Sequence, residues 1–272
     1  MTTPEMSDEE AIQYEAAEGV ARITLAESSG ENPLNTPALV ALSGALRTAE
    51  ASASIRAVVI SAKGEHFCRG MDLSAALLGE LDGSKESLRL FVDTLLLIRR
   101  SRLPVIACIE GKVTGGGLGL AAACDLVLAA PDASFMLPEV ILGMIPALIT
   151  PFLLRRVTPG RIGYLTLSSR ALSALEAREV GLVDEVTTDG ARAALARQLA
   201  RIGRSAPDAI AESKRSLDEL AGHDLERQIE AAFRLQHARL QRPEVQEGVR
   251  LFMDGFSPPW FQRIGGAHGT HE

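Results

Sequence analysis

Hydrophobic and polar residues alternate in the first half of the chain with a period that predicts short strands separated by helices. Alternation over residues 12–27, centred on Glu18 and Gly19, predicts a β-hairpin. Short apolar runs predict buried strands at residues 57–62, 105–109 and 126–129. This order of elements predicts an α/β fold with parallel strands in its core.

Helical periodicity fills two of the intervals between these strands. Residues 37–50 follow Thr36, a suitable N-cap, and open with Pro37, which favours the first helical position. The second helix is predicted over 84–100, where one face is apolar: Leu88, Phe91, Leu95 and Ile98. Residues 63–83 carry four glycines and little periodicity, so we expect a long irregular connection there.

The pattern changes after Pro159, where helical segments follow one another without predicted strands. These helices are predicted at residues 173–180, 190–203, 207–220, 224–240 and 243–254. Such a group cannot easily close a core of its own, so we expect it to pack on the α/β unit or on a neighbouring subunit. We therefore divide the chain into an α/β core (1–200), a helical region (201–260) and a disordered tail (261–272).

Composition narrows the class of protein. The 272 residues suit one large domain, or a core with a small appendage, and 46% hydrophobic residues suffice for a sizeable core. A net charge of −7 and only 4% aromatic residues argue against nucleic-acid binding. Neither a membrane-spanning run nor a signal peptide is evident, so no membrane association is expected.

The cysteines and histidines suggest neither disulfides nor a metal site. Cys68, Cys108 and Cys124 are odd in number and form no C-x-x-C pair, which indicates reduced thiols and a cytoplasmic protein. The five histidines lack metal-ligand spacing, so we expect no metal.

The strongest chemical signal is a glycine cluster directly after the predicted strand 105–109. Gly115, Gly116, Gly117 and Gly119 lie between this strand and a run of good helix formers. A P-loop is a poor match, because Lys112 precedes the glycines, and the spacing of a dinucleotide-binding fingerprint is missing. The exposed N–H groups at such a helix N-terminus suit the negative charge that develops on an acyl oxygen. The alternative is a turn that only lets the helix pack closely on a sheet.

Four segments, in this order, resemble the crotonase (enoyl-CoA hydratase/isomerase) superfamily. They are Phe67–Leu73, Gly115–Gly117 with Cys124 and Asp125, Pro138–Pro146, and Ala174–Asp184. The resemblance covers roughly residues 12–260 and implies a spiral of ββα units with a helical C-terminal trimerisation region. It also implies an oxyanion hole made by the backbone N–H groups of Met71 and Gly116, which would polarise a thioester carbonyl.

The resemblance also exposes a departure from the main hydratases, which use two glutamates. One position corresponds to Gly119, and the other to Glu139. The resemblance therefore implies that Glu139 is the catalytic acid/base and that a simple two-glutamate hydration site is absent. The residues alone favour a different interpretation, in which Glu139 after Pro138 stabilises the first turn of a helix.

A closer resemblance is to polyketide-biosynthesis hydratases that dehydrate 3-hydroxy-3-methylglutaryl groups on an acyl carrier protein. It rests on residues 110–113, Gly119, residues 145–156 and the terminus near Trp260. Bacterial methylglutaconyl-CoA hydratases are somewhat similar. Both imply a homotrimer or hexamer that needs no cofactor beyond the phosphopantetheine carrying the substrate. Catabolic hydration, double-bond isomerisation of acyl-CoA and an inactive scaffold remain alternatives.

Both resemblances imply a substrate with a distal carboxylate, which needs a cation or several donors when it is desolvated. His66, Arg69 and Lys112 lie in the motif loops and are the candidates, although solvated loop positions explain them equally well. Basic runs at 99–102 and 155–161 suggest either docking patches for an acidic carrier protein or ordinary solvated helix ends.

Overall fold

A six-stranded sheet forms the centre of the computed structural model, which describes residues 11–72, 81–187, 191–220 and 224–262. In spatial order its strands are β1 (Ile12–Ala17), β2 (Val20–Leu25), β4 (Ala57–Ala62), β7 (Val105–Ile109), β9 (Leu126–Ala129) and β12 (Glu185–Val186). Only the β1–β2 pair is antiparallel. The predicted hairpin and the three predicted buried strands are therefore confirmed.

Shorter strands form two smaller sheets beside the first. One contains, in spatial order, β11 (Leu172–Ser173), β10 (Ser134–Met136), β8 (Lys112–Thr114) and β5 (His66–Cys68). The other pairs β3 (Pro33–Leu34) with β6 (Gly70–Met71) in parallel. The second sheet holds β8 directly before the glycine cluster, and the third fixes the backbone at Met71.

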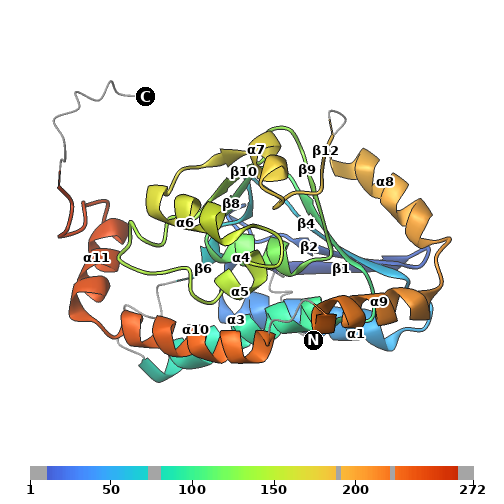
Figure 1. Cartoon of the computed structure of the whole chain (residues 1–272), viewed down its shortest axis with the longest axis horizontal. Coiled ribbons are helices and arrows are strands. Elements are labelled where there is room, and N and C mark those ends of the chain that lie inside the picture. Colours follow the sequence, from blue (N-terminus) through green and yellow to red (C-terminus); the bar gives the residue numbers. More distant parts are fainter. Residues whose placement is uncertain (1–10, 73–80, 188–190, 221–223, 263–272) are drawn as a thin grey trace, which may run out of the picture.

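Ten described helices surround these sheets. They are α1 (Thr36–Ala51), α3 (Leu81–Arg100), α4 (Gly116–Ala123), α5 (Thr150–Leu153), α6 (Pro159–Ser168), α7 (Ala174–Glu179), α8 (Ala191–Ile202), α9 (Pro207–Leu220), α10 (Leu225–Leu240) and α11 (Pro243–Met253). Figure 1 shows α1, α3, α9 and α10 along one side of the molecule, with α4 near its centre. The helix α10 packs against α3 and α5, so the helical region covers part of the α/β core.

Periodicity predicted the buried face of α3 correctly. Leu88, Phe91, Leu95 and Ile98 are all buried in the main hydrophobic core. The helix α4 has no polar face, because each of its residues from Gly116 to Ala123 is buried. It therefore lies inside the molecule, between the sheets and α3.

Two sequence-based expectations need correction. The N-cap of α1 is Asn35 rather than Thr36, because the Asn35 side chain accepts a hydrogen bond from the Ala38 N–H at 2.9 Å. The connection 63–83 contains β5 and β6, and β11 and β12 interrupt the segment expected to be helical. These strands have two or three residues each, too few for a periodic signal, and they form because distant segments pair with them. Residues 263–272 of the predicted tail lie outside the described residues.

Candidate active site

The glycine cluster forms a tight turn between β8 and α4. Gly115 has a φ of +52°, in the left-handed region that favours glycine, and its N–H donates to the Met136 carbonyl at 3.1 Å. A Cβ on Gly115 would lie 3.4 Å from Oε1 of Glu139. The predicted order of strand, glycine turn and helix N-terminus is confirmed, and the bare backbone at Gly115 lets the Glu139 carboxylate approach closely.

The N–H groups of Met71 and Gly116 lie beside each other at this turn. A Cβ on Gly116 would be 3.2 Å from the Met71 nitrogen. The Asp72 N–H donates to the Leu34 carbonyl at 3.3 Å, so the preceding N–H, that of Met71, points to the opposite side of β6. Gly116 is the first residue of α4, where an N–H has no acceptor within the helix. The geometry can therefore direct two donors at one oxygen atom.

Glu139 lies in a turn rather than in the first turn of a helix, contrary to the interpretation from Pro138. Its carbonyl accepts hydrogen bonds from the N–H groups of Leu142 and Met144, at 3.1 and 2.9 Å. Gly143 has a φ of +70° and ends this turn before Pro146. Helix-terminus stabilisation, the alternative to a chemical role for Glu139, therefore does not apply.

Burial controls the protonation of Glu139. Its Oε2 is shielded from solvent and has no hydrogen-bond partner among the described residues. Desolvation raises the pKa of this carboxyl from 4.5 to about 7, because burial disfavours the charged form. Leu142, Met144 and Ile145 line the same cavity, whereas Ile141 is exposed. A carboxyl with this pKa can accept and return a proton near neutral pH.

Ile149 fills the place that a side chain at position 119 would need. A Cβ on Gly119 would lie 2.3 Å from Cγ2 of Ile149 and 3.4 Å from Cδ1 of Leu95. The first distance is far below van der Waals contact. The position from which a second glutamate would enter the site is therefore closed by an apolar side chain.

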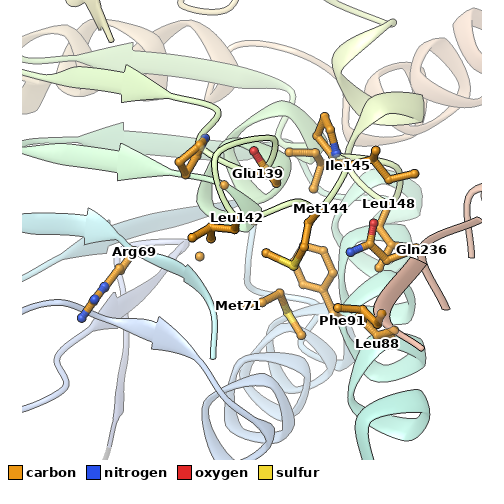
Figure 2. A pocket seen from close by; sticks show the side chains of 17 residues that line it. Arg69, Met71, Leu88, Phe91, Glu139, Leu142, Met144, Ile145, Leu148 and Gln236 are labelled. Atoms are coloured by element: carbon orange, nitrogen blue, oxygen red, sulfur yellow. The ribbon is translucent and has the colours of Figure 1, made fainter. Parts of the chain in front are cut away.

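A cavity of about 100 Å³ connects these groups, and its walls are mainly apolar. Its lining includes Met71, Leu88, Phe91, Gly116, Glu139, Leu142, Met144, Ile145, Leu148, Ile149, Gln236 and Leu240. Figure 2 shows the carboxyl of Glu139 and the amide of Gln236 in different parts of this site, with Met144 and Phe91 between them. Met71, Gly116 and Glu139, predicted to act together, are thus brought to one cavity.

Gln236 is a residue that sequence reasoning missed. It follows Ile229, Ala232 and Phe233 on the buried face of α10, and Leu240 comes one turn later. A single polar residue in an otherwise apolar helical stripe is the signal that could have identified it.

Of the three candidate cations, only Arg69 lines the cavity, and it forms an ion pair with Glu31. His66 and Lys112 are paired neighbours on β5 and β8 and do not contribute to the lining. The Lys112 side chain is exposed and lies 3.6 Å from Glu65. The cavity as lined here therefore gives no support to a role of His66 and Lys112 in binding a carboxylate.

The two basic runs contribute to packing between elements. Asp218 on α9 accepts hydrogen bonds at 2.6 Å from both Arg99 and Arg155. Burial opposes the ionisation of Asp218, but these hydrogen bonds outweigh it and lower the pKa of its carboxyl. Arg100 pairs with Glu226 on α10. Arg99, Arg100 and Arg155 are therefore engaged in ion pairs within the chain.

The turn that carries Glu139 is held from the C-terminal side. The indole of Trp260 lies against two glycines, since a Cβ on Gly143 or on Gly248 would approach it to 2.5 or 2.0 Å. The Trp260 Nε1–H donates to the Ile141 carbonyl at 3.2 Å, and Arg239 Nε donates to the Gly143 carbonyl at 2.6 Å. Residues from the helical region thus position the active-site turn.

Metal-binding clusters and membrane-spanning helices are both absent from residues 11–72, 81–187, 191–220 and 224–262. Within these ranges, no group of three or more His, Cys, Asp or Glu side chains is arranged to hold a metal ion. No helix in the described part of the chain combines the length and apolarity needed to cross a membrane. Cys68, Cys108 and Cys124 are buried and none of the three forms a disulfide, and burial raises the pKa of Cys68 and Cys124 to about 12.

Comparison with known protein families shows which family the chain belongs to. The enoyl-CoA hydratase/isomerase model matches residues 15–263. This chain belongs to the enoyl-CoA hydratase/isomerase family. The crystal structure of an enoyl-CoA hydratase from Mycobacterium avium matches the fold with a TM-score of 0.82 and 31% identity, covering 93% of this chain and 100% of that one.

Two curated relatives in the family carry more specific names. Bacillaene synthase dehydratase PksH from Bacillus subtilis is 28% identical and covers 92% of this chain and 95% of its own length. The 2,3-dehydroadipyl-CoA hydratase of Escherichia coli is 30% identical, and the match covers 87% of this chain and 92% of that protein. The fold is the mixed α/β crotonase fold with a helical C-terminal part, and the chain is a lyase of the hydratase/dehydratase type.

Proposed function

We propose that this chain dehydrates a 3-hydroxy-3-methylglutaryl thioester on an acyl carrier protein to the 3-methylglutaconyl thioester, during β-branching in polyketide biosynthesis. The observation that carries the proposal is one desolvated carboxyl, Glu139, lining the same apolar cavity as Met71 and Gly116, whose nitrogens lie close together. Ile149 takes the space of a second carboxylate, so one group must move every proton.

The proposed reaction begins with the ionised Glu139 carboxylate, which removes a proton from C2 of the acyl group. The C–H electron pair moves towards the thioester carbonyl and forms an enolate. Its oxygen accepts hydrogen bonds from the N–H groups of Met71 and Gly116, and each such donor typically contributes 10²–10³-fold in rate. The enolate then re-forms the carbonyl and the C2–C3 double bond, while the C3–O bond breaks.

The leaving hydroxyl takes the proton that Glu139 holds and departs as water, which restores the carboxylate. One group serves as base and then as acid, and a pKa near 7 suits both tasks. The reaction therefore uses this chain's own residues and, from outside the chain, only the phosphopantetheine that carries the acyl group.

The names of two relatives support the dehydration reaction and the acyl class. PksH is named a dehydratase of bacillaene synthase, and another relative is named a hydratase of 2,3-dehydroadipyl-CoA, whose acyl group has a distal carboxyl. The Mycobacterium avium structure, named an enoyl-CoA hydratase, favours a second candidate. This candidate is hydration or isomerisation of a CoA-linked acyl group in catabolism.

We also propose a homotrimer or a dimer of trimers. Leu217 and Leu220 on α9 are 65% and 81% exposed, as is expected for a helix that another subunit covers. Static light scattering at micromolar concentration should give three or six times the 29.0 kDa chain mass. A monomeric mass would contradict the proposed assembly.

The deciding experiment is a competition assay with purified protein. Crotonyl and 3-methylglutaconyl groups are offered on CoA and on an acyl carrier protein, and dehydration of the 3-hydroxy-3-methylglutaryl forms is followed by mass spectrometry. We expect the carboxylated acyl group on the carrier protein to be preferred. If crotonyl-CoA is hydrated as fast as the 3-methylglutaconyl thioesters, the proposed distal carboxylate of the substrate is wrong. If only the CoA thioesters react, the catabolic function replaces the polyketide one.

A further inference from the structure

Gln236 is buried in the wall of the acyl cavity without a hydrogen-bond partner. Only 7% of the residue is exposed, and its Oε1 is shielded from solvent and unpaired among the described residues. Figure 2 shows its amide end beside Leu148, with the amide nitrogen on the side of Phe91. Because a buried amide normally has hydrogen-bond partners, this one is an exception that needs an explanation.

The surroundings of Gln236 do not supply such a partner. The neighbouring lining residues Leu88, Phe91, Leu148 and Leu240 carry only apolar side chains. The amide offers two N–H donors and one carbonyl acceptor, and rotation about its last torsion exchanges their positions. A carboxylate in the cavity could accept hydrogen bonds from the two N–H donors of this amide, whereas a purely hydrocarbon acyl chain could not.

Gln236 and Glu139 come from segments that are far apart in the sequence. Glu139 follows β10 near the oxyanion donors, whereas Gln236 projects from α10 in the helical region. Glu139 acts next to the thioester in the proposed reaction, so Gln236 is available for a more distant part of the acyl group. The described lining has Arg69 as its cation, and that side chain is 55% exposed and paired with Glu31.

We propose that Gln236 is a specificity-determining residue that donates an amide N–H to the distal carboxylate of the acyl group. This inference rests on the proposed function and names a recognition residue for its substrate class. The class is acyl thioesters with a hydrogen-bond acceptor at the end remote from the thioester. A neutral amide recognises the carboxylate here, in addition to any cation at the mouth of the cavity.

The test compares two CoA thioesters that differ only in this carboxyl group, 3-methylglutaconyl-CoA and 3-methylcrotonyl-CoA, in the hydration direction. The variants are Gln236→Leu, which removes the amide, and Gln236→Glu, which keeps the shape but opposes the carboxylate. Gln241→Leu, at the exposed C-cap of the same helix, is the matched control. The ratio of the two kcat/KM values within one preparation does not depend on the folded fraction.

We expect Gln236→Leu to lower kcat/KM for 3-methylglutaconyl-CoA about 10- to 100-fold, as for the loss of a hydrogen bond to a charged group. The value for 3-methylcrotonyl-CoA should stay within about threefold or rise. Gln236→Glu should lower the ratio further, because two carboxylates would be placed together. Gln241→Leu should leave the ratio unchanged.

Different results would overturn the two proposals. A wild-type preference for 3-methylglutaconyl-CoA that persists in Gln236→Leu overturns the role of Gln236 and leaves the proposed function standing. An equal loss on both thioesters also overturns it, because Gln236 would then only support packing. Wild-type protein that hydrates 3-methylcrotonyl-CoA, but does not act on 3-methylglutaconyl-CoA, overturns the proposed function itself.

Discussion

A Cβ on Gly119 would lie 2.3 Å from Cγ2 of Ile149, so the two positions cannot both carry a side chain in this geometry. Gly119 belongs to the buried helix α4, and Ile149 is the N-cap residue of α5. The contact packs these helices closely and replaces a potential second carboxylate with an apolar group. It thereby connects the packing of the core with the number of acid/base groups in the site.

The first prediction concerns this contact. Gly119→Ala should destabilise the protein by about 1–3 kcal/mol through overpacking, measured by urea unfolding. Ile149→Ala in the same chain should recover part of that loss, since it vacates the space. Gly163→Ala on α6 is the control, because nothing lies within 4 Å of its added methyl group. If the two changes in the free energy of unfolding simply add in the double variant, the side chains at positions 119 and 149 do not overlap directly.

The second prediction concerns Glu139. Glu139→Gln should lower turnover by at least roughly 10²-fold, because the amide cannot take the C2 proton. The thermal unfolding temperature of the variant should be no lower than that of the wild type, since the carboxyl has an unpaired buried oxygen. Glu110→Gln, at an exposed position, serves as the control. Near-normal turnover of Glu139→Gln would exclude its role as acid/base.

The third prediction is the pH dependence of stability. Burial raises the pKa of Glu139 from 4.5 to about 7, so the folded protein holds a proton that the unfolded chain has lost. This contribution is fully present below pH 4.5 and is lost as the pH rises to about 7, in total about 3 kcal/mol. Between pH 4.5 and about pH 7, the free energy of unfolding of the wild type should therefore fall relative to that of Glu139→Gln. If the wild type instead becomes more stable relative to the variant as the pH rises, the pKa of Glu139 is not raised.

The fourth prediction is the pH dependence of dehydration. The free enzyme needs Glu139 ionised to remove the C2 proton, so kcat/KM should rise with pH and level off above about 7. Residual activity of Glu139→Gln should lack this step. A profile that is flat between pH 5 and pH 8 would show that another group limits the reaction.

The fifth prediction concerns Trp260, whose indole supports the turn that carries Glu139. Trp260→Ala should lower kcat/KM about 10- to 100-fold through misplacement of the carboxyl. It should also lower stability by about 1–3 kcal/mol, less than for a fully buried tryptophan, because Trp260 is 39% exposed. Phe261→Ala, at a 63% exposed neighbouring position, should change neither quantity. Equal effects of the two changes would contradict a specific role for Trp260.

Much of the fold followed from local pattern. The period of apolar residues predicted the hairpin, the three buried strands and the helices of the C-terminal region. The order strand, glycine turn and helix was also evident, because glycine at positive φ and good helix formers are local properties. The four motifs resembling the superfamily then pointed to Met71, Gly116 and Glu139, which the structure brings to one cavity.

Only the tertiary structure decided the rest. The short strands β5, β6 and β8 exist because distant segments pair with them, and His66 and Lys112 on these strands are not among the residues that line the cavity. Gly119 could be identified as lacking a carboxylate, but its filling by Ile149 depends on how α4 packs against α5. The position of Gln236 at the cavity likewise depends on α10 packing against α3 and α5, a contact between segments far apart in the chain. Local sequence determines which elements form and which groups they carry, whereas long-range packing decides which of these groups face the same space.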